Sequence, residues 1–505
     1  MDYSYAIRVA ANKYPKRTAV LYKDTRTSFE ELDQRINRLA GGLLDIGMGG
    51  TRVASILLNE PMTIYLYMAL ARIGAVSVPL NVRLKEREKE YIVQNSEATK
   101  LIVDNEYLGE AIHLRDHIPN LNALVTVNAK GVNDSTLMHL EEIADRGASE
   151  EITADVKEDD PAMIMYTSGT TGFPKGVVRT HGANLWNVAN SALGSPRNPK
   201  DIELFTLPIF GIGFIHFAMP TLLAGATLVL DRAFNPKRTW ELIEKHRVTR
   251  TFLAPTMVDS MLAVPENKTY DISSLEIIYS AYDFAEKLRD RALERFGNRF
   301  VYMYGLTEGQ LTCARPGEFA NNPTSAGKAM GMMRVRILND KGAPLEVGQI
   351  GEIALEGPSI MSGYYHLPEA TTQSLRNGWV LTGDLGYLDE EQNVHFSGRK
   401  KELIKTGGFN VDPIELENKL LELETLREAA VVGVPDEHWG EMVVAFVAKN
   451  PEAKISEEEI IHFCKKETAD YKVPKRIIFV EELPKNPTGK VERGRLRTLW
   501  KEEHS

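Results

Sequence analysis

The 505-residue sequence is poor in cysteine and has no excess of positive charge. Its two cysteines, Cys313 and Cys464, lie far apart and form no paired spacing, which excludes a disulfide framework and a thiolate metal site. Lys and Arg number 60 against 70 Asp and Glu, a formal charge of −10, which argues against a general affinity for nucleic acid or anionic membranes. We therefore expect a protein of a reducing compartment, the cytoplasm, without nucleic-acid partners.

The sequence also lacks an uninterrupted apolar run that would cross a membrane. Residues 205–230 carry no charge and are long enough to do so, but prolines and glycines such as Pro208 and Gly213 interrupt them. Leu228–Leu230 at their end has the character of a buried strand. The charged residues 1–17 do not form the apolar core of a secretory signal. We expect neither export nor stable membrane insertion.

Apolar β-rich runs alternate with amphipathic helical stretches through most of the chain, which is typical of an α/β fold. The strand-like runs are Val53–Leu57, Ala75–Pro79, Leu101–Val103, Ala123–Val127, Leu228–Leu230 and Ile277–Tyr279. Helical patterns cover Phe29–Ile46, preceded by Thr27 and Ser28, and Pro236–Arg247. We expect a large N-terminal domain of packed β-sheets flanked by helices, with a β-rich subdomain over Val335–Ile353 and Gly378–Phe396.

A chain of this length exceeds what one hydrophobic core usually holds, so we expect a multidomain α/β (α+β) protein. The polar, basic segment Ser397–Lys401 is the predicted boundary, because a new helix (Pro413–Leu423) and new strands (Ala429–Val434, Val443–Ala448) follow it. The predicted units are a large domain over 1–398, a hinge over 399–401 and a small mobile domain over 402–505. No carrier module follows Lys490, so we expect a stand-alone protein.

The segment 167–176 carries the strongest functional signal. An apolar strand, Met163–Tyr166, runs into a loop that is dense in hydroxyls and glycines and contains Lys175. Glycines let the backbone approach an anion, hydroxyls and amides donate hydrogen bonds, and a lysine adds positive charge, a combination that suits a polyphosphate. A kinase P-loop would end in Gly-Lys-Ser/Thr, whereas Pro174 and Gly176 flank this lysine. A surface hairpin turn would explain the Gly and Pro but not the hydroxyls.

This loop resembles the signature of the adenylate-forming (ANL) superfamily, which includes acyl-CoA synthetases, peptide-synthetase adenylation domains and beetle luciferases. Further segments match the superfamily in the same order along the chain: Tyr304–Glu308, Gly351–Ile353, Met361–Tyr364, Leu381–Asp384, Gly398–Arg399, Gly407–Gly408 and Asn486–Lys490. The resemblance implies an ATP-dependent acid–thiol ligase. Such an enzyme converts a carboxylate and ATP to acyl-AMP and pyrophosphate, and then transfers the acyl group to coenzyme A with release of AMP.

The resemblance also implies roles for individual residues. Lys490 matches the catalytic lysine that contacts the carboxylate and the α-phosphate, Glu308 the magnesium ligand, and Thr307 its phosphate or AMP partner, so ATP, Mg²⁺ and coenzyme A are the expected cofactor and substrates. Tyr304 would lie near adenine, and Asp384 would accept hydrogen bonds from the ribose hydroxyls beside Arg399. The implied ATP/AMP-binding residues are Thr167, Ser168, Gly169, Thr170, Thr171, Gly172, Lys175, Ser280, Ala281, Tyr282, Tyr304, Thr307, Asp384, Arg399 and Lys490.

The second half-reaction requires Lys490 to withdraw before a thiol can enter. In the superfamily the small domain rotates for this purpose, and Lys401 occupies the matching hinge position. Thr406, Gly407 and Gly408 match the loop that lines the tunnel for the pantetheine of coenzyme A.

The sequence departs from the superfamily around the predicted acyl pocket, which we assign to Phe210, Gly211, Tyr282 and Gly305. Relatives often carry a histidine where this chain has Gly211, and whether His216 compensates is open. In place of the usual small residues beside adenine stands Ser280-Ala281-Tyr282-Asp283, so either Tyr282 lines the pocket or the local backbone differs. The basic residue expected to contact the coenzyme A phosphate stands at Arg232 rather than at Ala233.

These departures leave the acid open among short- and medium-chain, cyclic and aromatic acids. Alternatives to the coenzyme A ligase are an acyl-AMP ligase that loads a separate carrier protein and a non-catalytic nucleotide-binding homologue. Luciferase-like oxidation shares the first half-reaction and also stays open. The oligomeric state is open, and a homodimer is compatible with the sequence.

We predict that Lys490→Ala separates the two half-reactions. Acid-dependent ATP–pyrophosphate exchange is expected to be abolished, while thioester formation from preformed acyl-adenylate is largely retained, because the lysine serves only the first geometry. Both rates are measured on the same preparation. Equal loss of both steps would refute the assignment of Lys490.

Overall fold

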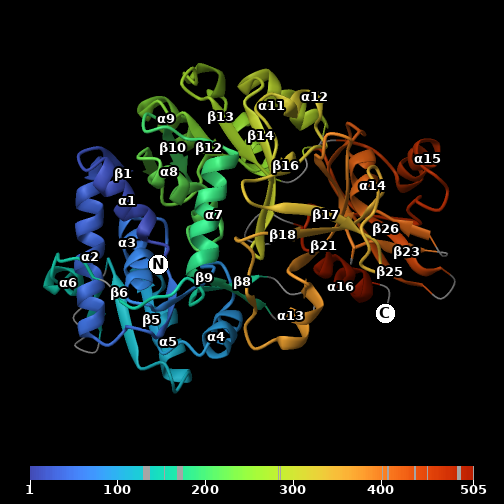
Figure 1. The fold of residues 1–505 in the computed structure, drawn as a ribbon. Coiled ribbons are helices and arrows are strands. Elements are labelled where there is room, and N and C mark those ends of the chain that lie inside the picture. The colour runs from blue at the N-terminus through green and yellow to red at the C-terminus, as the bar shows by residue number, and fades with distance from the viewer. Residues whose placement is uncertain are drawn as a thin grey trace.

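The computed structural model describes residues 1–128, 137–152, 154–167, 174–281, 284, 286–400, 402–406, 409–436, 439–451, 453–485 and 491–503. These residues form four β-sheets covered by helices, which confirms the α/β expectation (Figure 1). Three sheets come from residues up to Arg399, and the fourth comes from residues after it. In Figure 1 the elements of the fourth sheet lie together at one side of the molecule, opposite helices α2 (Phe29–Asp45) and α6 (Leu140–Arg146).

An eight-stranded sheet has the order β19-β9-β8-β4-β3-β5-β6-β7. Its strands are β3 (Arg52–Ile56), β4 (Val76–Pro79), β5 (Lys100–Asp104), β6 (Ala123–Val127), β7 (Met138–His139), β8 (Pro161–Thr167), β9 (Lys175–Thr180) and β19 (Gly363–Tyr364). The predicted strands in this region are confirmed. The parallel strands β3 to β6 are joined by α3 (Pro61–Arg72), α4 (Glu86–Asn95) and α5 (Leu108–His117), whereas β8, β9 and β19 pair antiparallel.

A nine-stranded sheet has the order β16-β15-β14-β13-β12-β10-β11-β1-β2. Its strands are β1 (Thr18–Tyr22), β2 (Thr25–Ser28), β10 (Ile202–Phe205), β11 (Thr227–Leu230), β12 (Arg250–Phe252), β13 (Ile277–Ser280), β14 (Phe300–Leu306), β15 (Gly309–Cys313) and β16 (Lys328–Ala329). The accompanying helices are α1 (Tyr5–Lys13), α2, α7 (His181–Gly194), α8 (Met219–Leu223), α9 (Pro236–His246), α10 (Pro255–Leu262), α11 (Glu286–Phe296) and α12 (Glu318–Asn321).

Apolar helix faces hold these two sheets together. Helix α2 begins at a capping box in which Ser28 accepts from the Glu31 amide and Glu31 accepts from the Ser28 amide, so Ser28 is the lead-in residue that the sequence predicted. The largest core cluster includes Ile36 of α2, Leu66 of α3, Phe214 and Met219. Residues 205–230 fold as strand β10, a π-helical turn (Phe214–Ala218), α8 and β11, and most are buried, so the interpretation of this stretch as core is confirmed.

Among the described residues, none of the helices has both the length and the apolar character to cross a bilayer.

The third sheet, order β17-β18-β21-β20 with β22 paired to β21, confirms the predicted β-rich piece. Its strands are β17 (Arg334–Leu338), β18 (Gly351–Glu356), β20 (Leu375–Arg376), β21 (Trp379–Leu388) and β22 (Val394–Arg399), and α13 (Pro368–Ser374) leads into β20. Strand β22 therefore extends into the predicted boundary segment, since Arg399 pairs with Asp384 of β21.

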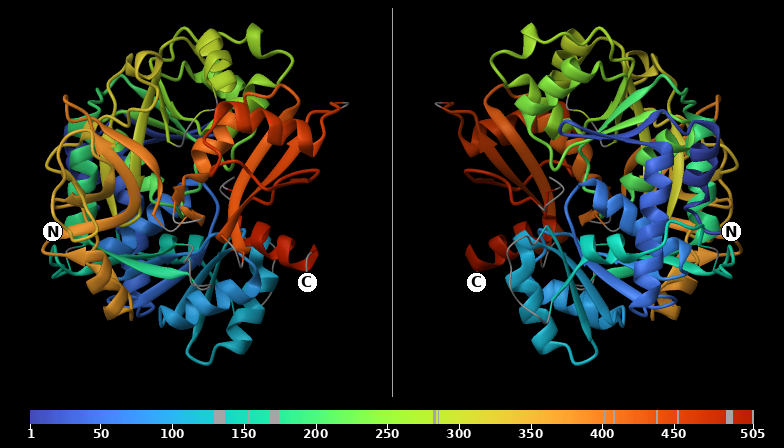
Figure 2. Two further views of the ribbon diagram at one scale, coloured as in Figure 1. Left: turned by 90° about the vertical axis from the view of Figure 1, so that its right-hand side faces the viewer. Right: turned by 90° about the vertical axis from the view of Figure 1, so that its left-hand side faces the viewer.

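The fourth sheet has the order β24-β23-β26-β25, with β27 paired to β26. Its orange-red elements lie together at one side of the molecule in both views of Figure 2. Its elements are β23 (Ile404–Thr406), β24 (Phe409–Val411), α14 (Pro413–Leu420), β25 (Leu426–Asp436), β26 (Gly440–Lys449), α15 (Glu457–Glu467), β27 (Arg476–Phe479) and α16 (Arg493–Glu503). The predicted helix ends three residues early, because Leu421 to Leu423 turn toward β25. The long β25–β26 hairpin has its own apolar clusters, which include Val431 and Val432 on its two faces.

Two histidines in the packed interior make the stability of the folded state sensitive to acid. Burial lowers the pKa of His181 to about 4 and that of His216, also facing the charge of Arg179, to about 3. In the unfolded chain the pKa of a histidine is near 6.5, so below this pH the unfolded chain binds protons that these two histidines do not bind in the folded chain. The free energy of unfolding therefore decreases as the pH falls below about 6.5.

We predict that His216→Asn flattens this loss by about 1.4 kcal/mol per pH unit between pH 6 and 5. The thermal midpoint, followed from pH 7 to 5, measures the change of slope, and the exposed His462→Asn is the matched control. Parallel curves for His216→Asn and the wild type would contradict the prediction.

Candidate active site

The stem of the predicted phosphate loop is an antiparallel hairpin. Strand β8 ends at Thr167 and β9 begins at Lys175, and these two residues are paired across the hairpin. Ser168, Gly169, Thr170, Thr171 and Gly172 lie outside the described residues. The pairing brings both ends of the loop together beside the edge strand β19.

Tyr364 of β19 links Lys175 to Glu308. The Lys175 Nζ lies 5.1 Å from the centroid of the Tyr364 ring, and the Tyr364 hydroxyl donates to Glu308 Oε1 at 2.8 Å. Burial, and then the neighbouring Glu308, raise the pKa of Tyr364, which keeps its hydroxyl protonated as a donor. The loop lysine and the predicted magnesium ligand, far apart in sequence, are thus joined through one aromatic side chain.

Glu308 lies in the turn between β14 and β15, and two neighbours fix its backbone. The Met361 amide donates to the Glu308 carbonyl at 2.7 Å, and Arg179 Nη1 donates to the carbonyl of the preceding Thr307 at 2.9 Å. Tyr364 and Arg179 were given no role by the sequence reasoning. Tyr364 lies within a matched segment, which was the available signal, whereas nothing in the pattern around Arg179 indicated its contacts.

The predicted nucleotide partners Tyr304, Asp384 and Arg399 also come together. Arg399 Nε lies 2.9 Å from Asp384 Oδ1, and the Tyr304 hydroxyl donates to Asp384 Oδ2. Burial, and then Asp384, raise the pKa of Tyr304 well above its usual value. A carboxylate has about four lone-pair sites, so Asp384 retains acceptor capacity for ribose hydroxyls. The Tyr304 ring lies 5.9 Å from that of Phe396, which gives the site an aromatic surface.

The predicted adenine segment is described only at its start. The Ser280 side chain is fully buried and its hydroxyl donates to the Leu253 carbonyl at 2.7 Å, so this hydroxyl is bound within the protein. Ala281 follows as a half-buried residue, while Tyr282 and Asp283 lie outside the described residues.

At the predicted acyl pocket, Gly305 is exposed and Phe210 is half-buried against the core of the eight-stranded sheet. A Cβ on Gly211 would meet the Pro208 carbonyl oxygen at 3.3 Å, so a side chain there fits tightly. His216 is 8% exposed in the π-helical turn, and its Nε2 has no hydrogen-bond partner among the described residues. Its neighbour Phe217 packs against Tyr279 and Phe252, with ring centroids 5.3 and 5.2 Å away.

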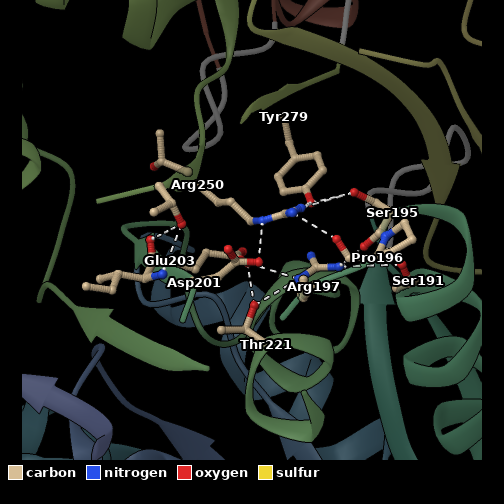
Figure 3. Close-up of polar contacts among 12 residues, drawn as sticks. Ser191, Ser195, Pro196, Arg197, Asp201, Glu203, Thr221, Arg250 and Tyr279 are labelled. Carbon is tan, nitrogen blue, oxygen red and sulfur yellow. Dashed lines mark hydrogen bonds and ion pairs between the residues drawn. The ribbon is translucent and has the colours of Figure 1, made fainter. Parts of the chain in front are cut away.

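A buried charge network holds the Tyr279 hydroxyl of this aromatic group (Figure 3). Arg250 Nη1 donates to the Tyr279 hydroxyl at 2.9 Å, and the Ser195 hydroxyl lies 2.7 Å from it. Arg250 pairs with Asp201 at 2.9 Å and Arg197 with Glu203 at 3.2 Å, all four nearly inaccessible to solvent. Each buried cation has its own carboxylate, so the network is neutral and rigid.

In the C-terminal part, Thr406 is buried and pairs with Gly440 at the edge of β26. Lys401, Gly407, Gly408 and Lys490 lie outside the described residues. Phe409, 55% exposed, and Trp439, 40% exposed, lie near this loop, and Lys475 Nζ lies 5.3 Å from the Trp439 ring centroid.

Arg232 lies between two carboxylates. Its guanidinium is 3.3 Å from Asp104 Oδ1 and 2.5 Å from Glu106 Oε1. The charge of Arg232 is therefore neutralised within the protein. This disfavours a contact between Arg232 and the phosphate of coenzyme A.

Two family models together match most of this chain. Residues 7–365 match the family described as AMP-binding enzyme, and residues 415–490 match the AMP-binding enzyme C-terminal domain. The chain is 34% identical over 507 residues to an indoleacetate–CoA ligase of Aromatoleum aromaticum, covering 99% of this chain and 98% of the relative. It is 34% identical over 493 residues to a feruloyl-CoA synthase of Amycolatopsis sp, covering 96% of each.

Solved structures agree in fold over nearly the whole chain. ATP-bound MatB from Rhodopseudomonas palustris is 28% identical with a TM-score of 0.90, covering 100% of both chains. The o-succinylbenzoate CoA synthetase MenE from Bacillus subtilis, in complex with its acyl-adenylate intermediate, is 29% identical with a TM-score of 0.86, covering 97% of each chain. The chain therefore belongs to the AMP-binding enzyme family, the superfamily of adenylate-forming enzymes.

Proposed function

We propose that this enzyme is an AMP-forming carboxylate–CoA ligase. It activates a carboxylic acid with ATP to acyl-AMP and pyrophosphate, and transfers the acyl group to coenzyme A. The observation that carries the proposal is the convergence of Lys175, Tyr364 and Glu308 on one side of the site and of Asp384 and Arg399 on the other. Lys175 and Tyr364 belong to the eight-stranded sheet, Glu308 follows a strand of the nine-stranded sheet, and Asp384 and Arg399 belong to the third sheet, so three sheets contribute to the site.

The residues present fit Mg²⁺ bound together with ATP. No three acidic, His or Cys side chains within the described ranges are placed to hold a metal unaided. Mg²⁺ at nucleotide sites usually takes one or two carboxylates and completes its shell with phosphate oxygens and water, and Glu308 supplies such a carboxylate. When bound, the ion neutralises charge that develops on the phosphates.

In the proposed first half-reaction, the chain mainly positions two anions. Lys175 and the loop after Thr167 bind the polyphosphate, and Asp384 holds the ribose with Arg399 beside it. Lys490 contacts the substrate carboxylate and the α-phosphate, where its charge offsets the negative charge of the transition state. Withdrawal of Lys490 by rotation at Lys401 then opens the site to the thiol through the loop of Thr406, Gly407 and Gly408.

We propose an aromatic acid as the first class to test among the short, medium-chain, cyclic and aromatic acids. Two relatives are named for indoleacetate and ferulate, both of which are aromatic. In this chain Phe217, a few residues after Gly211 of the predicted acyl pocket, lies tilted against the Tyr279 and Phe252 rings, and aromatic rings favour edge or offset contact with another ring.

A panel of acids, scored by ATP-dependent AMP release and acyl-CoA formation, tests this function. Indoleacetate and ferulate are expected to give higher kcat/KM than butyrate, octanoate and cyclohexanecarboxylate. AMP release with none of these acids, under conditions where ATP and Mg²⁺ are saturating, would contradict the assignment.

The second candidate acceptor is the phosphopantetheine of a separate carrier protein. Coenzyme A is favoured because the exposed Trp439 and Phe409 rings and Lys475 offer stacking surfaces and a cation near the thiol loop, which suit a nucleotide. Parallel assays with coenzyme A and with a phosphopantetheinylated carrier protein separate the two.

The proposed domain limits are 1–398, 399–401 and 402–505. Strand β22 ends at Arg399 and β23 begins at Ile404, which leaves a short connection at the proposed hinge. Composition supports a cytoplasmic location, since the two cysteines are buried and unbridged.

We predict that Tyr364→Phe lowers the rate of ATP–pyrophosphate exchange about tenfold, because it removes a hydrogen bond to a charged carboxylate while keeping the ring beside Lys175. Tyr365→Phe is the matched control, since that hydroxyl donates to Glu97 instead. Similar rates for Tyr364→Phe and Tyr365→Phe would remove Tyr364 from the site.

A further inference from the structure

Arg179 of β9 is a fully buried arginine that donates its hydrogen bonds to neutral acceptors. Its side chain is among the largest that have no exposure. Nε donates to Asn184 Oδ1 at 2.7 Å, Nη1 to the Thr307 carbonyl at 2.9 Å, and Nη2 to the Ser359 and Ala183 carbonyls at 3.2 and 3.4 Å. The guanidinium is therefore surrounded by oxygen atoms that carry no formal charge.

Other buried arginines of this chain have a carboxylate in direct contact. These pairs are Arg72 with Asp33, Arg197 with Glu203, Arg250 with Asp201, and Arg493 with Glu402 and Glu417. Within the described ranges, Arg179 forms no ion pair at a nitrogen–oxygen distance of 4.0 Å or less. Burial lowers the pKa of Arg179 to about 10, a cost that Glu308 partly offsets from a greater distance, and the side chain remains charged at neutral pH.

The two carbonyls that Arg179 holds belong to the turns that build the site. Thr307 directly precedes Glu308, and Ser359 begins the segment in which Met361 donates to the Glu308 carbonyl and Tyr364 donates to its carboxylate. Arg179 itself lies on the strand that begins with Lys175, and Asn184 is on the first turn of α7. One side chain therefore ties the phosphate strand to both turns around Glu308.

We propose that Arg179 is a positioning residue for adenylation: it sets the Thr307–Glu308 turn against the phosphate strand, and its unneutralised charge favours the polyphosphate anion. This inference rests on the proposed ATP-dependent function. The hydrogen bonds fix geometry, and the buried charge acts through a medium of low dielectric, where screening by salt is weak. The bound anion would thus supply the negative charge that the surrounding protein lacks.

The two contributions are separable by substitution. Arg179→Lys keeps the charge but cannot span both carbonyls and Asn184, because an ammonium lacks the planar fork of donors. Arg179→Met removes the charge and the donors while retaining a similar length. Arg72→Met is the matched control, since it also removes a fully buried arginine, but one that contacts Asp33 and Asn37 instead of the site.

Equilibrium binding of MgATP by calorimetry and the rate of ATP–pyrophosphate exchange are measured for each full-length variant, with thermal midpoints as the record of folding. We expect Arg179→Met to weaken MgATP binding about tenfold, and Arg179→Lys to bind within about threefold of the wild type. Both are expected to lower kcat for exchange about 100-fold, the size of loss that a displacement of about 1 Å in a reacting geometry produces.

Arg72→Met is expected to lower the thermal midpoint while leaving MgATP affinity and kcat unchanged. Asn184→Ala removes only the side-chain oxygen that accepts from Arg179 Nε, so it is a milder change. It serves if both Arg179 substitutions fail to fold. We expect this variant to have a lower kcat and an unchanged affinity for MgATP. If the folded variants lose thermal stability but keep wild-type affinity and kcat, Arg179 is structural and the inference is overturned. Failure of the wild type to bind MgATP would instead overturn the proposed function.

Discussion

The pairing of β9 with its two neighbours is the interaction on which the site depends. On one side β9 pairs antiparallel with β8, which closes the predicted phosphate loop between Thr167 and Lys175. On the other it pairs with β19, which places Tyr364 opposite Val177 and therefore beside Lys175. Main-chain hydrogen bonds of this kind set the register residue by residue, and a slip of one position would turn every side chain to the opposite face. The contact between Tyr364 and Glu308 follows from that register.

Buried arginines near this strand have two kinds of hydrogen-bond partner. Behind the predicted acyl site, Arg197 and Arg250 are each paired with a carboxylate, so that part of the interior is neutral and its hydrogen bonds are internal. Beneath the Thr307–Glu308 turn, the acceptors that hold Arg179 among the described residues are carbonyls and an amide oxygen. A buried cation whose hydrogen-bond acceptors are neutral creates a positive electrostatic potential around it. Because the substrates are a carboxylate and a triphosphate, this potential attracts both of them.

The sequence predicted the helices, the strands and the order of the segments that match the superfamily better than it predicted which side chains are in contact. Strands such as Ala123–Val127 were read from apolar runs, and the lead-in of α2 from Ser28, because these signals are local. Asp384 and Arg399 were expected together from the resemblance, and they are. The roles of Tyr364 and Arg179 depend on which strands pair and on burial, and neither is encoded in the spacing around those residues. The exposure of Trp439 likewise depends on how the β25–β26 hairpin ends.

The charge network also fixes the aromatic side chains that pack on it. The Tyr279 hydroxyl is fixed by Arg250 and Ser195, and Arg197 lies 5.3 Å from the centre of its ring, so the side chain cannot swing away without breaking two buried hydrogen bonds. Leaving buried partners unsatisfied costs about 1 to 3 kcal/mol each. Phe217, which packs on this fixed ring, lies in a π-helical turn, a geometry that is often found at functional sites. The Phe217 ring therefore packs against a partner whose position is fixed from the other side, which restricts how this part of the core can rearrange.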